Sequence, residues 1–336
     1  MNDDEELLIE DDDLDLLEGE QQLAGSQELY EHLRLEVDRG QVPLRIDKYL
    51  TEHTQHSSRN RIQQAADAGF LFVNDKPVKS NYKVRSGDVI TLMLDRPHFD
   101  TTIEPEDIPL DVRYEDDDLM VIYKPAGMVV HPGCGNFHGT LVHAIAWHLR
   151  NLPTYDPNDP QVGLVHRIDK DTSGLLVICK TNLAHQSLAE QFAEHSINRI
   201  YSCIVYNHFD NDSSVVNKPI ARAKNDRKKM AIDPDGRRAV THIYLQENLK
   251  DNFAYVKCKL ETGRTHQIRV HLTSINHPLL GDPVYGPKSC PYNLNGQVLH
   301  AGTLGFIHPR TNEYMEFTSD LPDYFTKLLN LLKPNQ

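Results

Sequence analysis

The chain has 336 residues, more than a single hydrophobic core usually holds, so we expect two domains and a tail. Hydrophobic residues make up 39% of it, and no apolar run approaches the roughly 20 residues of a membrane-spanning helix, which excludes a membrane partner. Its first residues lack the basic and apolar regions of a secretory signal, and its five cysteines are scattered. We therefore expect a cytoplasmic protein.

The net charge of −14 is distributed unevenly. Residues 1–26 hold eleven acids and no Lys or Arg, so the remaining residues together carry only −3. Because like charges repel one another, we expect residues 1–40 to form an acidic, disordered tail. The total charge therefore does not exclude a nucleic-acid partner for the rest of the chain.

Residues 41–96 have the composition of a small basic domain. Residues 44–94 carry a net charge of +3. Their pattern predicts two helices, at 45–52 and 58–68, and two strands, at 70–73 and 89–94. Cations near the start of a helix, together with its free N–H groups, suit phosphate. We expect RNA contacts from five basic residues: Arg45, Lys48, Arg59, Arg61 and Lys83.

Two segments of this region, LRIDKYL and SRNRIQQAADAGFLFVNDKPVKSNYKVRSGDVI, resemble the S4-type RNA-binding module of ribosomal proteins and RNA-modifying enzymes. The resemblance implies a small S4-type (αL) domain over residues 41–96. A solvated basic helix in an unrelated domain is the alternative.

Three prolines, Pro97, Pro105 and Pro109, predict an extended linker over residues 97–110. Beyond it, residues 111–333 mix β-prone and helical runs. Strands are expected at 119–123, 175–179, 200–205, 241–245 and 255–260, and helices at 140–149 and 183–195. This mixture predicts an α+β domain with a mixed, largely antiparallel sheet.

The segment GLVHRIDKDTSGLLVICK (163–180) places Arg167, Asp169 and Asp171 in a turn between apolar runs. A carboxylate in such a place can act as a nucleophile or as a general base. The composition of this segment alone favours an ordinary surface turn.

Three further segments change this interpretation: KPAG (124–127), NRIYSCIV (198–205) and LETGRTHQIRVHL (260–272). In order and spacing, the four segments resemble the motifs of the RluA family of pseudouridine synthases. EPEDIPLDVRYEDDDLMVIYKPAGMVVHPGCGN and HPLLGDPVYG are similar to the RluD branch, which modifies large-subunit ribosomal RNA. The resemblance covers residues 40–333, and the sequence departs from the pattern where HRID replaces the usual HRLD.

The resemblance implies a role for each matching residue. Asp169 corresponds to the catalytic aspartate, Tyr201 to the residue that stacks on the base, and Arg269 to the partner of the carboxylate. Arg167 corresponds to the arginine that enters the helix stack, because a stacked uridine must be extruded before it can react. We also expect RNA contacts from a basic loop and a neighbouring arginine, namely Arg227, Lys228, Lys229 and Arg264, although the loop also fits a solvated charged hairpin.

We expect no metal or cofactor. His131, Cys134, His138 and His143 are only loosely spaced like metal ligands, and no companion CxxC pair exists. Neither GxGxxG nor GxxxxGK[ST] occurs in the sequence.

The implied substrate is 23S ribosomal RNA, at the helix 69 stem-loop, and the implied enzyme is a monomer. Three alternatives remain open. They are a transfer-RNA pseudouridine synthase, a non-catalytic assembly factor that binds ribosomal RNA, and an N-glycosidase in which water captures C1′ and uracil leaves.

Overall fold

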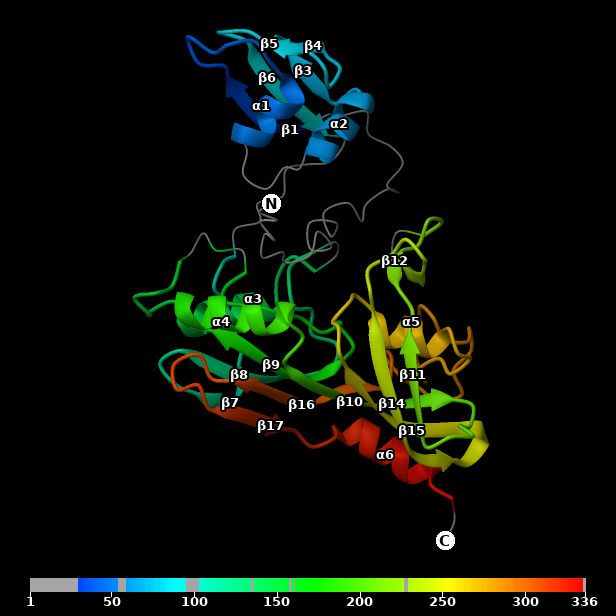
Figure 1. Ribbon diagram of the computed structural model, residues 1–336. Helices are drawn as coiled ribbons and strands as arrows, with labels where there is room; N and C mark the ends of the chain where they lie inside the picture. Colours follow the sequence, from blue (N-terminus) through cyan, green and yellow to red (C-terminus); the bar gives the residue numbers. More distant parts are fainter. Residues whose placement is uncertain are drawn as a thin grey trace. The chain divides into compact units, whose positions relative to one another are not determined.

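The computed structural model describes residues 30–53, 59–94, 103–133, 136–156, 159, 161–226 and 229–334. These residues fall into two compact units, a smaller one within residues 22–101 and a larger one that begins at residue 102 (Figure 1). No helix among the described residues is long and apolar enough to cross a membrane.

In the smaller unit, two helices pack on short antiparallel strands. The helices are α1 (Ile46–His53) and α2 (Arg59–Asp67), and their apolar residues share one core with the strands. Gly69 follows α2 in the left-handed conformation (φ 81°), which glycine adopts without a Cβ clash. The four-stranded sheet has the order β1 (Tyr30–Glu36), β6 (Val89–Leu94), β3 (Leu71–Val73), β4 (Lys76–Pro77), while β2 (Leu44–Arg45) pairs with β5 (Lys83–Val84).

The expectation of a disordered tail over residues 1–40 is wrong for residues 30–40, because β1 lies there and pairs along β6. Leu33 and Leu35 pack against the core of the smaller unit and Val37 is buried in it. Their alternation is a strand signal that the acidic composition of the preceding residues obscured. Residues 1–29 lie outside the described residues.

The second half of the expected linker belongs to the larger unit. Ile103 is buried in the core of that unit, and Glu106 accepts hydrogen bonds from the Gly139 N–H. The prolines favour extended backbone, but an extended segment can still pack against a domain.

Among the described residues, the larger unit is built on one sheet of nine strands, and this sheet is mixed and largely antiparallel, as expected. Eight strands follow each other in the order β11 (Ser213–Asn217), β14 (Val240–Leu249), β15 (Phe253–Leu260), β10 (Asn198–Tyr206), β16 (Leu299–Ile307), β9 (Ser173–Cys179), β8 (Leu119–Lys124), β7 (Asp111–Glu115), and β17 (Tyr314–Thr318) pairs with β16. All neighbours are antiparallel except β16 and β9. A separate hairpin consists of β12 (Ile220–Arg222) and β13 (Met230–Ile232).

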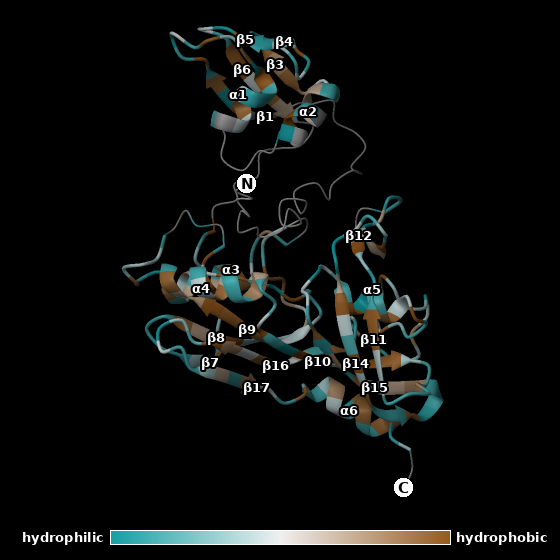
Figure 2. Ribbon diagram, in the orientation of Figure 1, coloured by the Kyte–Doolittle hydropathy of each residue, from teal (hydrophilic) through white to brown (hydrophobic). Residues whose placement is uncertain are grey.

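Both faces of this sheet are covered. Along β8, Met120 and Ile122 share a core with α3 (Leu141–Leu149) and α5 (Gln267–Thr273), whereas Leu119 and Val121 pack with α4 (Asn182–Ala193). Helix α6 (Asp323–Leu332) packs in a further apolar cluster that includes Ile204 of β10. Apolar residues, brown in Figure 2, accordingly run along the central strands.

The sheet order brings distant motifs together. Strand β16 lies between β9, which follows the Asp169 loop, and β10, which carries Tyr201, while β15 leads into α5 and Arg269. Gly174 permits the close approach of β9 and β16, because a Cβ there would lie 2.2 Å from the carbonyl oxygen of Ala301.

Candidate active site

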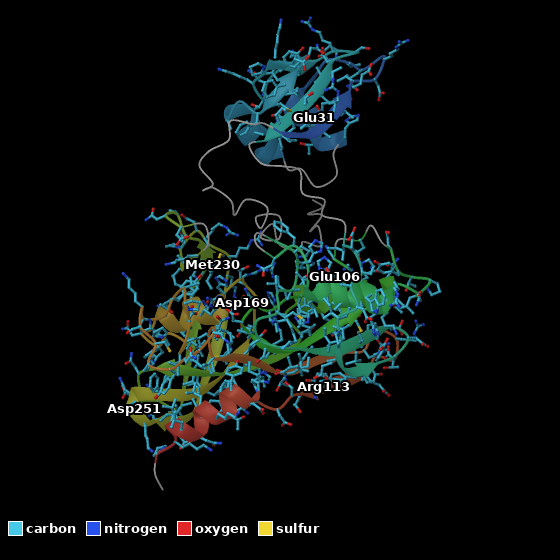
Figure 3. The ribbon with its side chains drawn as sticks, turned by 180° about the vertical axis from the view of Figure 1, so that it is seen from behind. Glu31, Glu106, Arg113, Asp169, Met230 and Asp251 are labelled. Atoms are coloured by element: carbon cyan, nitrogen blue, oxygen red, sulfur yellow. The ribbon has the colours of Figure 1, made fainter. Side chains whose placement is uncertain are left out.

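Asp169 lies in the loop before β9, in the middle of the larger unit (Figure 3). Its carbonyl accepts a hydrogen bond from the Thr172 N–H at 3.1 Å, which closes a turn, and the neighbouring Ile168 is buried in the core. Its Oδ2 accepts a hydrogen bond from Arg269 Nη1 at 2.9 Å. The Asp169 side chain keeps 26% of its surface exposed, so a substrate can reach it.

Arg269 is held from its other side by Asp282. Its Nε and Nη2 donate to the two oxygens of Asp282 at 2.8 and 2.9 Å, and Asp282 Oδ1 also accepts the N–H groups of Val284 and Tyr285. This bidentate pairing fixes the guanidinium and leaves Nη1 for Asp169. The sequence reasoning missed Asp282, although the residue lies inside the HPLLGDPVYG segment.

Asp169 is ionised at neutral pH. Burial raises its pKa, but the electrostatic interactions with His266, Arg269 and Arg167 and the Arg269 hydrogen bond together lower it below its ordinary value. An ionised carboxylate with one fixed and one open oxygen can act as a nucleophile or as a base.

Tyr201 lies on β10, opposite Cys258 of β15 and Ala301 of β16, and is largely buried. Burial and the charge of Asp169 both raise the pKa of its phenol, while Arg199 lowers it, and the net pKa is raised. The phenol is therefore protonated at neutral pH.

Arg199 is a buried cation on the same strand that the sequence reasoning passed over. Its guanidinium lies over the Phe192 ring, and burial lowers its pKa. A Cβ on Gly263 would lie 2.4 Å from Arg199 Nη1, so the glycine of the GRTHQIR segment makes room for this side chain.

His266 and Tyr285 complete the surroundings of Asp169, and the sequence reasoning gave neither of them a role. His266 Nε2 lies 3.9 Å from Asp169 Oδ1, and His266 Nδ1 lies 2.8 Å from the Tyr285 hydroxyl. The Arg269 guanidinium carbon lies 5.1 Å from the centroid of the Tyr285 ring. Only the GRTHQIR and HPLLGDPVYG motifs could have indicated these two residues.

Lys124 explains the KPAG motif. It is fully buried, and its Nζ donates to the carbonyls of Pro125, Met128 and Lys170 at 2.8–2.9 Å. Burial lowers its pKa to about 7. Because Lys170 follows Asp169 directly, Lys124 connects the Asp169 loop to the end of β8.

The remaining residues expected to bind RNA in the larger unit lie in its loops. The charge of Arg167 acts on Asp169, and Arg264 Nε donates to the Arg238 carbonyl at 3.2 Å. Lys229 precedes β13 and lies 3.8 Å from Asp226. Arg227 and Lys228 lie outside the described residues.

In the smaller unit, two of the expected RNA-binding residues share one buried acid. Arg45 and Arg59 both donate to Asp47 at 2.9–3.1 Å. Lys83 lies opposite Arg45 in the β2–β5 pair, and Lys48 is exposed on α1. Arg61 lies in α2, but its side chain is outside the described part of the chain.

Two groups of described residues have metal-ligating atoms within 4.8 Å of one another, namely Glu106 with His138 and His143, and Asp116 with Asp118 and His308. In the second group, Arg310 already binds Asp118 with two nitrogens. Neither group includes Asp169 or a residue that pairs with it.

The comparisons agree with this geometry. The family model described as RNA pseudouridylate synthase matches residues 118–274, and the S4 domain model matches residues 44–90. A human protein, RNA Pseudouridylate Synthase Domain Containing 1, shares the fold, with a TM-score of 0.54 and 24% identity over 68% of this chain and 89% of its own. Fold and site together define an enzyme that modifies RNA.

Among curated proteins, the chain is 45% identical to the uncharacterized RNA pseudouridine synthase YlyB of Bacillus subtilis, over 87% of this chain and 95% of that protein. It is 43% identical to the ribosomal large subunit pseudouridine synthase D of Zymomonas mobilis, over 86% and 93%, and 39% identical to that of Haemophilus influenzae, over 90% and 95%. The chain belongs to the RNA pseudouridine synthase family, in which it joins an S4 domain to the catalytic domain.

Proposed function

We propose that this enzyme isomerises uridines to pseudouridines in large-subunit ribosomal RNA, and that Asp169 is its catalytic carboxylate. The observation that carries the proposal is the contact between Asp169 and Arg269, since it supplies an ionised and oriented carboxylate with an open oxygen. The relatives named large subunit pseudouridine synthase D match nearly the full length of this chain, which supports ribosomal RNA as its substrate.

The reaction keeps every atom of the uridine. The bond between ribose C1′ and uracil N1 breaks, and its electron pair stays on the uracil. The uracil rotates and C5 bonds to C1′. The proton that then leaves C5 balances the proton that N1 gains. Asp169 starts the reaction either by attack on C1′ or by removal of a ribose proton.

Two further residues support these steps in the proposal. Tyr201, protonated and largely buried, stacks on the uracil, and its hydroxyl lies available for proton transfer. Arg167 fills the place that the extruded nucleotide leaves in the helix, because its planar guanidinium can stack on bases.

The test of the catalytic carboxylate is tritium release from RNA that contains 5-tritiated uridine. We expect Asp169→Asn to abolish release while RNA binding stays within a few-fold of wild type. Asp171→Asn, the same change two residues along the loop, serves as the matched control and should retain most of the turnover. Full turnover by the Asp169 variant would remove the assignment.

The proposed target is the helix 69 stem-loop, and transfer RNA is the second candidate. Unpaired or loop uridines cost less to extrude than uridines stacked in a duplex, which favours a stem-loop. Incubation of the enzyme with ribosomal RNA and with transfer RNA, followed by carbodiimide mapping, separates the two. Pseudouridine in transfer RNA alone would refute the ribosomal assignment. Unchanged RNA mass distinguishes isomerisation from loss of uracil.

A further inference from the structure

His266 has a constrained backbone and a fixed neighbour. It precedes α5 in the left-handed conformation (φ 54°), a region that residues with a Cβ rarely adopt. Its ring is largely buried, and Nδ1 lies 2.8 Å from the Tyr285 hydroxyl. A non-glycine residue held in this conformation beside a catalytic carboxylate suggests a functional constraint.

The hydrogen bonds around Tyr285 determine where the proton of His266 lies. The Tyr285 oxygen already accepts the Met230 N–H at 2.8 Å, so its own proton is available for His266 Nδ1. Burial raises the pKa of Tyr285 to about 12, and burial also lowers the pKa of His266 against the charge of Asp169. A neutral imidazole that accepts at Nδ1 carries its proton on Nε2.

The Nε2 nitrogen lies 3.9 Å from Asp169 Oδ1, beyond hydrogen-bond distance. The other oxygen of Asp169 is bound by Arg269, so Oδ1 is the one that faces the histidine. A hydroxyl oxygen that lies about 2.8 Å from each of two atoms 3.9 Å apart makes an angle of about 90° with them, so one hydroxyl can bond to both. The gap therefore suits a hydroxyl that accepts from His266 and donates to Asp169.

We propose that His266 and Asp169 together bind the 2′-hydroxyl of the target ribose, and so make the enzyme specific for RNA at the nucleotide that it isomerises. The 2′-hydroxyl is the ribose hydroxyl next to C1′, the carbon at which the bond to uracil breaks. It donates and accepts, and it is the group that distinguishes RNA from DNA. The inference rests on the proposed role of Asp169.

The experiment uses the full chain and a stem-loop RNA with one mapped target uridine, made with either ribose or 2′-deoxyribose at that position. For the wild type we expect kcat/KM to favour the ribose form by about tenfold or more, because the deoxy form leaves a buried donor unpaired. In His266→Asn the preference should fall to within about threefold. Asparagine tolerates the left-handed backbone but is too short to reach the hydroxyl.

Two further variants make the test specific. Tyr285→Phe keeps the ring beside Arg269 but removes the hydroxyl that fixes the tautomer, so its ribose preference should lie between those of the wild type and His266→Asn. His185→Asn, on α4 and hydrogen-bonded to Gln161, is the matched control and should keep the wild-type preference.

A wild-type enzyme that accepts both sugars equally, or a His266→Asn variant that keeps the full preference, overturns the inference. If the variant turns over too slowly, its relative equilibrium affinities for the two RNAs give the same comparison. Failure of the proposed function gives different results from failure of this inference. It would be seen if Asp169→Asn retained turnover, or if the wild type made no pseudouridine in ribosomal RNA.

Discussion

Both units contain a cluster of acids and arginines, but the ratio of acids to arginines is reversed between them. In the smaller unit one buried acid, Asp47, binds Arg45 and Arg59, whose side chains remain 44% and 54% exposed. In the larger unit one arginine, Arg269, is only 5% exposed and binds two acids, Asp169 and Asp282. The formal charge of the first group is +1 and that of the second is −1.

The sign of the remaining charge matches the role that we propose for each group. Exposed arginines held by a buried acid present oriented donors to solvent, which suits the phosphates of RNA. A buried arginine that binds two acids leaves one net negative charge, which suits the role that we propose for Asp169 as the reacting carboxylate. In the roles that we propose, a buried acid thus orients two RNA-binding arginines in one unit and, through Arg269, the reacting carboxylate in the other.

The largest expected effect comes from Asp282→Asn, which breaks the bidentate half of the Arg269 pair. Removal of one partner of a buried ion pair costs about 3–5 kcal/mol, so the free energy of unfolding of the larger unit should fall by that amount. Turnover should also fall, because Arg269 loses its orientation toward Asp169. Urea denaturation measures the first effect and tritium release the second. Unchanged stability would show that Asp282 does not hold Arg269.

Lys124→Met tests a buried lysine whose Nζ is held by carbonyls and not by an acid. The change removes the shared donor of three partly buried carbonyls, and an unsatisfied buried acceptor costs about 1–3 kcal/mol. We expect a loss of about 2–4 kcal/mol in unfolding free energy and a less rigidly held Asp169 loop. Lys218→Met, at a half-buried lysine that also donates to a carbonyl, is a control and should cost less. Equal losses in the two variants would contradict the account.

In the smaller unit, changing Arg45 and Arg59 together to Gln should weaken RNA binding and leave turnover at saturation nearly intact. Each lost phosphate contact reduces the slope of log affinity against log salt by about 0.7–0.9, so the slope should fall by about 1.5. Filter binding over a salt series measures it. Arg34→Gln, at an exposed arginine on β1 paired with Glu31, is the control. An unchanged slope would remove these arginines from the RNA surface.

The smallest effect concerns pH. Burial raises the pKa of Asp47, but its hydrogen bonds to Arg45, Gln63 and Arg59 lower it far below its ordinary value. A carboxylate with a depressed folded-state pKa contributes stability above its unfolded pKa of about 4, and that stability is lost as pH falls further. Unfolding of the smaller unit should therefore become easier below about pH 4. Asp47→Asn should be less stable at pH 7 and less sensitive to acid.

The sequence predicted the elements whose local patterns are strong. Six elements begin and end within two residues of their expected bounds, namely the helices α1 and α2 and the strands β8, β9, β10 and β15. Strand β1 was missed because its apolar alternation follows a long acidic segment. Residues 103–110 were assigned to a linker because proline content indicates extended backbone but not whether that backbone is packed.

The sequence predicted only those site residues to which a motif assigned a role. Asp169 and Arg269 come from motifs 100 residues apart, and the structure brings them into contact. The importance of Asp282, His266 and Tyr285 is seen only in the folded structure. Asp282 forms a bidentate pair with Arg269, His266 lies in a left-handed turn, and the Tyr285 hydroxyl accepts a backbone N–H. No spacing rule reports such contacts, because they depend on how β15, α5 and the following loop pack.

The central claim is that Asp169 makes pseudouridine in large-subunit ribosomal RNA. The most direct measurement maps carbodiimide-marked pseudouridines in ribosomal RNA from cells that lack this gene and are complemented with either the wild type or Asp169→Asn. We predict that the wild type restores pseudouridines, including those in helix 69, and that the variant, expressed at an equal level, restores none. Restoration of the same sites by Asp169→Asn would contradict the account.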